Sequence, residues 1–510
     1  MKKRAIVSVS DKTGVVEFCK NLIDCGFEII STGGTKKVLD EAQIETLSIE
    51  SVTNFPEMLD GRVKTLHPLI HGGLLGVLDN ENHIKQMEKH NITPISLVCV
   101  NLYPFKKTIN TEGKTFEDAI ENIDIGGPSM LRSAAKNHKF VSVVCDNEDY
   151  DLVIKELKEN GDTTYNTRLY LATKAFRSTA AYDTMIQKYL SNYTEIKNDE
   201  LLLNYSLKQE LRYGENPHQN AAFYSDGLSY RYSMTTAKQL HGKELSYNNI
   251  QDANATLQIL KEFEKTPAVV AVKHMNPCGV GLDDTITGAW KKAYESDPVS
   301  IFGGIVAFNE EVNIECANDM SKMFLEIILA PSFSEEAFNI LSKKKNIRLM
   351  TFDLEGNDDK QKLVSVTGGV LVQDNDNIIE KYEDFTVVTE KQPTQKEIED
   401  ALIGLKIVKH VKSNAIVLVK DKMSVGVGAG QMNRVGACLI ACEQAKDKAV
   451  GSVLASDAFF PMDDTVELAA KYGITCIIQP GGSIKDQDSI DKCNEHNIAM
   501  IFTGKRHFKH

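Results

Sequence analysis

The chain has 510 residues, which is too long for one compact core and predicts about two to four domains. Its 42% hydrophobic and 25% charged residues are typical of a folded protein and exclude disordered or collagen-like sequence. The formal net charge of −13 argues against a non-specific nucleic-acid binder, because such proteins need a basic surface.

The apolar runs are shorter than the roughly 20 residues that cross a bilayer, and the start MKKRAIVSVSDK reads as a first strand rather than a signal peptide. We therefore expect a cytoplasmic protein with no membrane partner. The 10 cysteines are scattered without a CxxC pair, and Cys438 and Cys442 are spaced as on one helix. Reduced, buried thiols are favoured over disulfides or a zinc site.

Residues 1–145 alternate between short apolar runs and helical patterns, which predicts a mostly parallel sheet covered by helices. The expected strands are Ala5–Val9, Phe27–Ile30, Ser96–Val100 and Phe140–Cys145. A long helical stretch follows, from about Tyr165 to Leu190. The polar stretch 191–200 predicts a domain boundary, with a first domain over 1–195 and a second over 200–510.

The second domain is also mixed α/β and contains an internal echo. Each copy reads as a strand, a glycine turn, a helix, SerAsp and then Phe. The turns are at 279–281 and 426–428, and the SerAsp pairs are at 296–297 and 456–457. Chance similarity is the alternative for so short a pattern. The shared order favours tandem copies of one α/β unit, about 200–385 and 386–510.

Unusual polar clusters follow the predicted strands of the first domain. In open α/β sheets, ligands bind beyond the carboxyl ends of the strands. The clusters are at 8–12, 31–35, 61–68, 101–104 and 124–128. Gly33 and Gly34 let backbone N–H groups approach an anion at the start of a helix, although an ordinary strand-to-helix turn explains them equally well. Because no Walker A spacing occurs, a phosphomonoester fits better than a nucleoside triphosphate.

Two further patterns carry possible chemistry. Arg132 and Lys136 lie four apart on one helical face, and from spacing alone a solvated surface is the favoured interpretation. Lys273 and His274 end an apolar strand at a sheet edge, where the pair can supply a cation and a proton acceptor, or His274 can simply cap the strand. The GVGAG stretch at 426–430 is a weak match to a dinucleotide turn.

The clusters, in this order and over essentially the whole chain, resemble the family of bifunctional purine-biosynthesis enzymes that fuse AICAR formyltransferase to IMP cyclohydrolase (AICAR is phosphoribosylaminoimidazolecarboxamide). The matching segments are SVSDKTG, STGGT, FPEMLDGRVKTLHP, NLYPF, IDIGGPSM, AAKNH, LRYGENPHQ, VKHMNPCG, VKSNAIV, GVGAGQMNR, ASDAFFP, IQPGGS and RHFKH. The resemblance implies a methylglyoxal-synthase-like N-terminal domain that closes the ring of formyl-AICAR to give IMP. It also implies two cytidine-deaminase-like units without zinc, which transfer a formyl group from 10-formyltetrahydrofolate to AICAR.

The resemblance also implies two sets of site residues. The cyclohydrolase set is Ser10, Asp11, Lys12, Thr32, Gly33, Gly34, Thr35, Arg62, Lys64, Thr65, Asn101, Tyr103, Asp124, Ile125 and Lys136. The transferase set is Arg212, Tyr213, Lys273, His274, Phe302, Gly303, Glu326, Asn414, Arg434, Phe459, Asp464, Ser483 and Arg506.

Within the cyclohydrolase set, Lys136 matches the family's proton-transfer lysine, which replaces the solvated-surface interpretation of this residue. Lys64 and Tyr103 would stabilise a developing alkoxide, and Asp124 would accept a hydrogen bond from the amide.

Within the transferase set, His274 would take the proton of the amine and Asn414 would orient the carboxamide. Lys273 would either stabilise oxyanion charge or protonate the departing folate nitrogen. The reaction needs no transition metal, and a monovalent cation stays open. The family is homodimeric, with transferase sites at the subunit interface.

One departure is Asp463, which stands where relatives commonly have an arginine, and this puts the preference for folate polyglutamate tails in doubt. Two other functions stay open at this point. One is a single-activity enzyme with one degenerate pocket, and the other is a regulatory nucleotide-binding protein.

Overall fold

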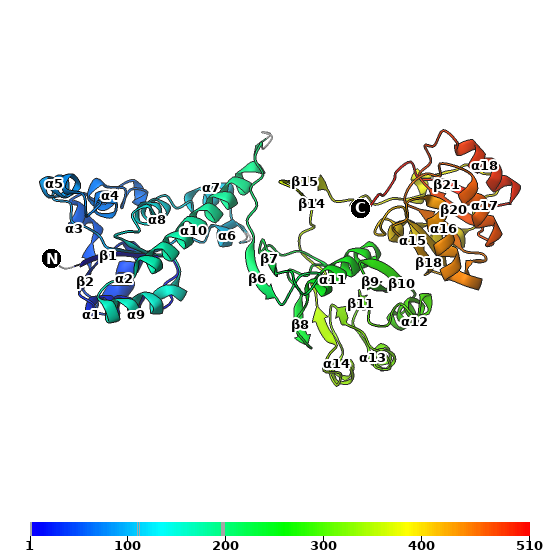
Figure 1. The fold of residues 1–510 in the computed structure, drawn as a ribbon, viewed down its shortest axis with the longest axis horizontal. Helices are drawn as coiled ribbons and strands as arrows, with labels where there is room; N and C mark the ends of the chain where they lie inside the picture. The colour runs from blue at the N-terminus through cyan, green and yellow to red at the C-terminus, as the bar shows by residue number, and fades with distance from the viewer. Residues whose placement is uncertain (1–2, 110, 112, 195–198) are drawn as a thin grey trace. The chain divides into compact units, whose positions relative to one another are not determined.

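A computed structural model describes residues 3–109, 111, 113–194 and 199–510. The chain forms two compact units, Met1–Asn204 and Tyr205–His510. Their division lies close to the polar stretch at which the sequence predicts a boundary. Figure 1 shows the elements of each unit along the chain.

The first unit contains a five-stranded sheet in the order β3-β2-β1-β4-β5, and every pair in it is parallel. Its strands are β1 (Lys3–Val9), β2 (Phe27–Ser31), β3 (Leu47–Ser48), β4 (Leu97–Asn101) and β5 (Ser142–Val144). Ala5, Ile6 and Val98 in the middle of the sheet are fully buried, as expected for strands covered on both faces. The predicted parallel sheet is confirmed.

Ten α-helices accompany this sheet within the described residues. They are α1 (Val15–Asp24), α2 (Gly33–Glu41), α3 (Ile49–Thr53), α4 (Pro68–Leu75), α5 (Glu81–Lys89), α6 (Phe105–Ile109), α7 (Phe116–Glu121), α8 (Gly126–Lys136), α9 (Tyr150–Asn160) and α10 (Tyr165–Ser191). The long helix α10 begins where the Thr164 side chain accepts a hydrogen bond from the Thr167 N–H, and it packs on α8 and β5.

The second unit is built around a mixed sheet of 12 strands in the order β16-β21-β20-β19-β17-β18-β10-β9-β11-β12-β13-β8. These strands are β8 (Lys238–His241), β9 (Ala268–Lys273), β10 (Asn276–Leu282), β11 (Ile305–Phe308), β12 (Ile327–Ala330), β13 (Arg348–Thr351), β16 (Thr386–Val387), β17 (Ile416–Lys420), β18 (Met423–Gly428), β19 (Val453–Ser456), β20 (Cys476–Gln479) and β21 (Ala499–Phe502). Two separate hairpins pair β6 (Ser206–Leu211) with β7 (Ala221–Ser225), and β14 (Gln361–Val366) with β15 (Gly369–Asp374). The helices are α11 (Tyr247–Leu260), α12 (Ile286–Ser296), α13 (Ile314–Met320), α14 (Glu335–Leu341), α15 (Gln395–Val408), α16 (Arg434–Ala445), α17 (Asp464–Lys471) and α18 (Asp486–Glu495).

The large sheet contains the same arrangement twice. The series α11-β9-β10-α12-β11-α13-β12-α14-β13 recurs as α15-β17-β18-α16-β19-α17-β20-α18-β21, and the β10–β18 pair joins the copies at the centre. In each copy, the first two strands are joined by a two-residue hairpin turn whose residues have positive φ, namely His274 and Met275 in one and Asp421 and Lys422 in the other. This is the geometry of a type I′ turn, which suits the twist of paired strands. The internal echo in the sequence therefore reflects a repeated α/β unit.

The predicted glycine turns of that echo are wrong. Gly281 lies inside β10 and Gly428 inside β18, where each faces a helix of its own copy. A Cβ atom on Gly281 would lie 2.4 Å from the Ala289 carbonyl oxygen, and one on Gly428 would lie 1.9 Å from that of Ala437. The repeated glycines therefore allow a helix to pack closely on a strand.

Candidate active sites

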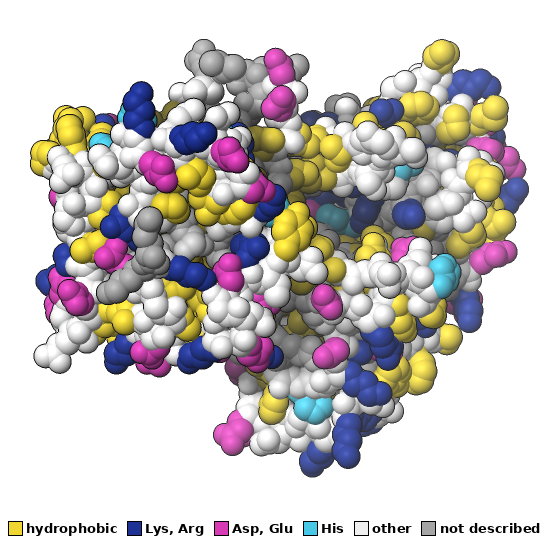
Figure 2. Space-filling model, turned by 60° about the vertical axis from the view of Figure 1, so that its left-hand side comes forward, with side chains coloured by type: hydrophobic (Ala, Val, Ile, Leu, Met, Phe, Trp, Pro, Cys, Tyr) yellow, Lys and Arg dark blue, Asp and Glu magenta, His cyan; other side chains and the backbone are white. Residues whose placement is uncertain are grey.

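The first unit has a cationic cluster at the amino end of α2. The helix begins at Gly33, directly after β2, so residues 33–35 form its first turn rather than the predicted loop. A Cβ on Gly33 would lie 3.9 Å from the Lys64 ammonium, and one on Gly34 would lie 3.8 Å from that of Lys12. Two ammonium groups therefore flank a helix amino end, which suits a phosphate group. The Lys64 ammonium is paired with the Glu57 carboxylate at 2.9 Å, so a bound phosphate competes with this carboxylate. Basic and acidic side chains are interspersed over the face in Figure 2, so anion binding depends on such local clusters.

Side-chain hydrogen bonds hold this edge of the sheet together. The Asn101 amide oxygen accepts from the backbone N–H groups of Ser10 (2.5 Å) and Asp11 (3.0 Å). The buried Thr35 hydroxyl exchanges hydrogen bonds with the Val9 backbone, and the Thr32 and Ser8 hydroxyls lie 2.8 Å apart. The ends of β1, β2 and β4 are thus fixed relative to one another.

The turn before α8 adds a carboxylate to this edge. The Asp124 carboxylate accepts from the Gly127 N–H at 2.8 Å. Burial raises the pKa of Asp124, although hydrogen bonds from the backbone of Gly127 and Tyr103 favour its charged form. A Cβ on Gly126 would lie 2.7 Å from the Thr65 hydroxyl, so the segment around Thr65 meets this turn. Tyr103 and Ile125 are 51% and 57% exposed, and they offer uncovered apolar surface to a flat ligand.

Two predicted residues stand apart from this cluster. Arg62 is exposed and forms an ion pair with Glu121. Lys136 is exposed and ends α8, whose amino end carries Asp124. Because an 11-residue helix spans about 16 Å, Lys136 lies toward the opposite edge of the sheet. The unit by itself does not bring Lys136 to the other cyclohydrolase residues.

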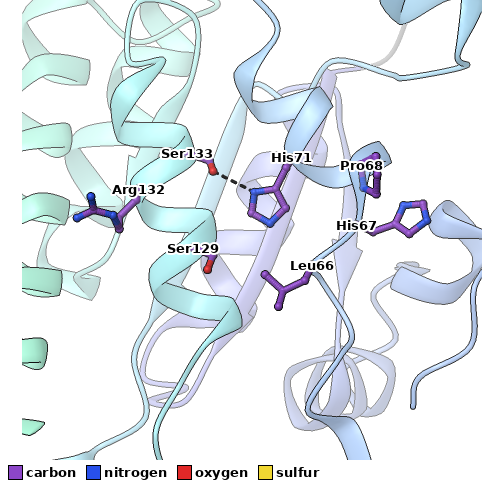
Figure 3. Close-up of a pocket in the computed structure, with 7 residues that line it drawn as sticks. All are labelled: Leu66, His67, Pro68, His71, Ser129, Arg132 and Ser133. Atoms are coloured by element: carbon purple, nitrogen blue, oxygen red, sulfur yellow. Dashed lines mark hydrogen bonds between the residues drawn. The ribbon is translucent and has the colours of Figure 1, made fainter. Parts of the chain in front are cut away.

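A cavity of about 580 Å³ opens between α4 and α8 (Figure 3). It is lined by Leu66, His67, Pro68, His71, Ser129, Arg132 and Ser133. His71 Nδ1 lies 2.9 Å from the Ser133 hydroxyl, and burial lowers the pKa of this imidazole. The end of the GRVKTLHP segment lines this cavity, which lies away from the cationic cluster at the amino end of α2.

In the second unit, the strand pairing places the predicted transferase residues at one edge of the large sheet, except Arg212 and Tyr213, which follow the separate β6–β7 hairpin. The end of β9 lies beside the start of β11, and the start of β17 lies beside the end of β19. Because β10 and β18 are antiparallel, the β9–β10 turn and the start of β17 share this edge. A hydrogen bond from the Lys412 N–H to the Asn276 side chain, at 3.3 Å, links them directly.

The first copy contributes the Lys273–His274 pair to this edge. The Lys273 ammonium donates to the Phe302 carbonyl oxygen at 3.0 Å, and the His274 side chain is exposed. Gly303, at φ 72°, turns the chain next to Phe302, whose ring is 57% exposed. An imidazole, an ammonium group and an aromatic ring thus surround an open edge.

The second copy contributes Asn414. Its amide oxygen accepts from Arg434 at 2.7 Å, and its NH₂ group donates to the Gln431 carbonyl oxygen at 2.8 Å. Arg434 is 5% exposed and forms an ion pair with the fully buried Asp457. The buried Arg434 therefore fixes the orientation of the Asn414 amide.

Glu326 is already paired within the fold. Its carboxylate lies 2.8 Å from the Arg348 guanidinium, which is 8% exposed and also donates to the Glu244 carbonyl oxygen. The remaining residues lie in segments that follow strands. Phe459 and Asp464 follow β19, Ser483 follows β20 and Arg506 follows β21. Arg212 follows β6 and stacks on Tyr213 at 4.8 Å.

Sequence reasoning missed three polar residues that support this edge. They are Asp252, Asn276 and Asp457, which bind backbone or side-chain groups next to His274 and Asn414. Asp457 belongs to the repeated SerAsp pair and Asn276 to the VKHMNPCG segment, whereas Asp252 carried no signal.

All ten cysteines are free, and Cys438 and Cys442 lie on α16 with their sulfur atoms 4.0 Å apart. Within the described parts of the chain, no group of three or more His, Cys, Asp or Glu side chains is placed to hold a metal ion. Among the helices of those same parts, none has the length and apolar character needed to span a membrane.

Two family models match the chain. The MGS-like domain matches residues 14–129, and the AICARFT/IMPCHase bienzyme matches residues 134–444. The bifunctional purine biosynthesis proteins PurH of Lysinibacillus sphaericus, Listeria monocytogenes and Anoxybacillus flavithermus are each 60% identical to it, over 100% of both chains. The crystal structure of ForH matches 37% of this chain and 98% of its own at 34% identity, with a TM-score of 0.33. The chain belongs to the AICARFT/IMPCHase bienzyme family, and it is an AICAR formyltransferase and IMP cyclohydrolase of purine biosynthesis.

Proposed function

We propose that the two activities reside in separate units, ring closure in Met1–Asn204 and formyl transfer in Tyr205–His510. The observation that carries the proposal is that each unit gathers its own cluster of polar residues at one edge of its own sheet. The family resemblance suggests a methylglyoxal-synthase-like first unit and cytidine-deaminase-like copies in the second, and the repeated topology is compatible with it.

For ring closure, the amino end of α2 with Lys12 and Lys64 holds the phosphate of formyl-AICAR. The amide nitrogen attacks the formyl carbon, and water then leaves. Tyr103 and Lys64 stabilise the developing alkoxide, and Asp124 accepts a hydrogen bond from the amide. Because both reacting groups belong to one molecule, the protein needs only to hold them together and move protons.

The proton-transfer role of Lys136 requires a second copy of the chain. Lys136 lies at the far end of α8, so its ammonium reaches the cyclohydrolase site of a partner subunit rather than that of its own. A homodimer is also favoured by the β14–β15 hairpin. Val364, Leu371 and Val372 are between 40% and 61% exposed there, and an isolated two-stranded hairpin is marginally stable in water.

For formyl transfer, positioning dominates. The reaction joins two molecules, and alignment supplies roughly 7–11 kcal/mol, whereas one acid–base residue gives about 10²–10⁴-fold. His274 takes the proton of the AICAR amine, and Asn414, fixed by Arg434, orients the carboxamide. Lys273 stabilises oxyanion charge or protonates the departing folate nitrogen.

The family assignment implies a folate co-substrate, and we propose 10-formyltetrahydrofolate. Asp463 immediately precedes α17 and places a negative charge where a polyglutamate tail would meet an arginine in relatives. We therefore expect this enzyme to prefer long polyglutamate tails less strongly than its relatives do. Asp463→Arg should increase that preference. The substrates are small molecules, and we expect the enzyme to act in the cytoplasm. The family resemblance leaves open whether the enzyme also binds a monovalent cation.

The function is tested by incubating the purified chain with AICAR and 10-formyltetrahydrofolate and following IMP by absorbance. Formation of IMP is expected. Turnover of AICAR without IMP, or IMP only from added formyl-AICAR, would indicate a single-activity enzyme. Binding of both substrates without turnover would indicate a regulatory protein.

A further inference from the structure

The turn that carries His274 is held in place by the carboxylate of Asp252, which lies on α11. Asp252 Oδ1 accepts a hydrogen bond from the Met275 backbone N–H at 2.7 Å, and the carboxylate also binds the His274 backbone N–H. His274 and Met275 have φ values of 54° and 62°. Side-chain-bearing residues adopt this left-handed region only where the surroundings enforce it. The half-buried Asp252 supplies that enforcement.

The second copy repeats the arrangement without the catalytic side chain. Asp400 on α15 accepts from the Asp421 and Lys422 backbone N–H groups at 3.0 and 2.8 Å. The strand ends match as well, because the Lys420 ammonium donates to the Val450 carbonyl oxygen as that of Lys273 does to Phe302. The two turns therefore share one framework and differ in both turn residues, which are His274 and Met275 in one and Asp421 and Lys422 in the other.

We propose that Asp252 is a positioning residue for formyl transfer, which fixes the β9–β10 turn so that the His274 imidazole is held at the AICAR amine. This inference rests on the proposed role of His274 as proton acceptor. A side chain on a two-residue turn has no strand or helix of its own to orient it, and its direction follows the turn backbone. The Asn276 side chain assists, because it donates to the His274 carbonyl oxygen at 3.1 Å and accepts from Lys412.

Asp400 provides a matched control within the same chain. We compare full-length Asp252→Asn and Asp400→Asn, which make the same chemical change next to two equivalent turns. In Asp252→Asn we expect kcat for formyl transfer to fall about 100-fold, the loss typical of a misplaced reacting group, while KM for AICAR stays near that of the unmodified enzyme. Asp400→Asn should lose a similar amount of thermal stability and keep its kcat. Cyclisation of added formyl-AICAR should be unchanged in both.

A third comparison shows through which residue Asp252 acts. His274→Ala should leave a small residual rate of transfer, because the two substrates are still aligned. Asp252→Asn in this background should not lower the residual rate further, because the residue that it positions is already absent. If Asp252→Asn does not fold, Asp252→Glu and Asp400→Glu replace the pair, since each keeps the carboxylate and moves it by one methylene.

The possible results separate the two proposals. If His274→Ala reduces transfer to a small residual rate but the Asp252 and Asp400 variants keep equal kcat values, the positioning role is overturned and the role of His274 stands. An additive loss in the His274→Ala background also overturns it. If His274→Ala retains normal transfer, the role of His274 fails and the inference fails with it.

Discussion

The imidazole of His507 is buried between two carboxylates near the end of the chain. Nδ1 lies 2.6 Å from Asp376 and Nε2 lies 3.0 Å from Glu380, while its backbone N–H donates to the Asp457 carbonyl oxygen. Burial alone would lower the pKa of His507, but the hydrogen bonds and charges of Asp376 and Glu380 outweigh it and raise the pKa to about 9. The C-terminal segment next to Asp457 is therefore held by a charged histidine.

This pairing predicts a stability that depends on pH. The folded pKa lies above the ordinary value of 6.5, so the stabilising contribution is complete below pH 6.5 and is lost as the pH rises through about 9. Lys509 acts in the opposite direction, because burial lowers its pKa to about 8 and its contribution to stability therefore rises with pH above that value. The effect of His507 is isolated by comparing urea unfolding of the unmodified chain and of His507→Gln between pH 6 and 10. The difference between their unfolding free energies should fall by about 3 kcal/mol over this range, and a difference that does not change with pH would contradict the assignment.

Single residues were partly predictable. Lys273, His274 and Asn414 carried a sequence signal because they belong to unusual polar segments after or before apolar strands. Asp252 carried none, because an aspartate within an amphipathic helix looks like any solvated residue. The burial of Arg434 could not be predicted either, because its ion-pair partner Asp457 follows a strand that is distant in sequence.

The elements of the repeat depend on close contact between helix and strand. Gly428 faces the Ala437 carbonyl oxygen of α16, at a distance that leaves no room for a methyl group. Gly428→Ala should therefore destabilise the second unit by about 1–3 kcal/mol, because the helix must move away from the strand. Gly369→Ala in the exposed hairpin is the control, because its Cβ would meet a neighbour only at 3.6 Å. Equal midpoints of urea unfolding in the two variants would contradict this packing.

The helices and strands were more predictable than the contacts through which they pack. Strands β1, β2, β4 and β5 of the first unit were expected within a few residues, because continuous apolar runs separated by amphipathic helices have few other solutions. The edge strand β3 was missed, because its two residues, Leu47–Ser48, form no apolar run. The GlyValGly segments were misread as turns, because glycine favours both turns and close packing. The two are distinguished by the alanines of the helix that follows each strand, such as Ala289 opposite Gly281 and Ala437 opposite Gly428.

At the scale of the whole molecule, the position of Lys136 makes a prediction about assembly. If Lys136 serves the site of a partner subunit, Lys64→Ala and Lys136→Ala chains should each lack cyclohydrolase activity. Co-expressed in equal amounts, they should recover about a quarter of it, because half of the dimers are mixed and each mixed dimer has one intact site. Cyclisation of formyl-AICAR by the purified mixture is the measurement. No recovery from proven mixed dimers would place Lys64 and Lys136 in the same subunit's site.

The most direct measurement compares both half-reactions in full-length His274→Ala and Lys136→Ala. His274→Ala should form IMP from added formyl-AICAR at the normal rate and keep only a small residual rate of formyl transfer from 10-formyltetrahydrofolate to AICAR. Lys136→Ala should consume AICAR normally and form no IMP. Loss of both activities in either folded variant would contradict the assignment of the two reactions to separate units.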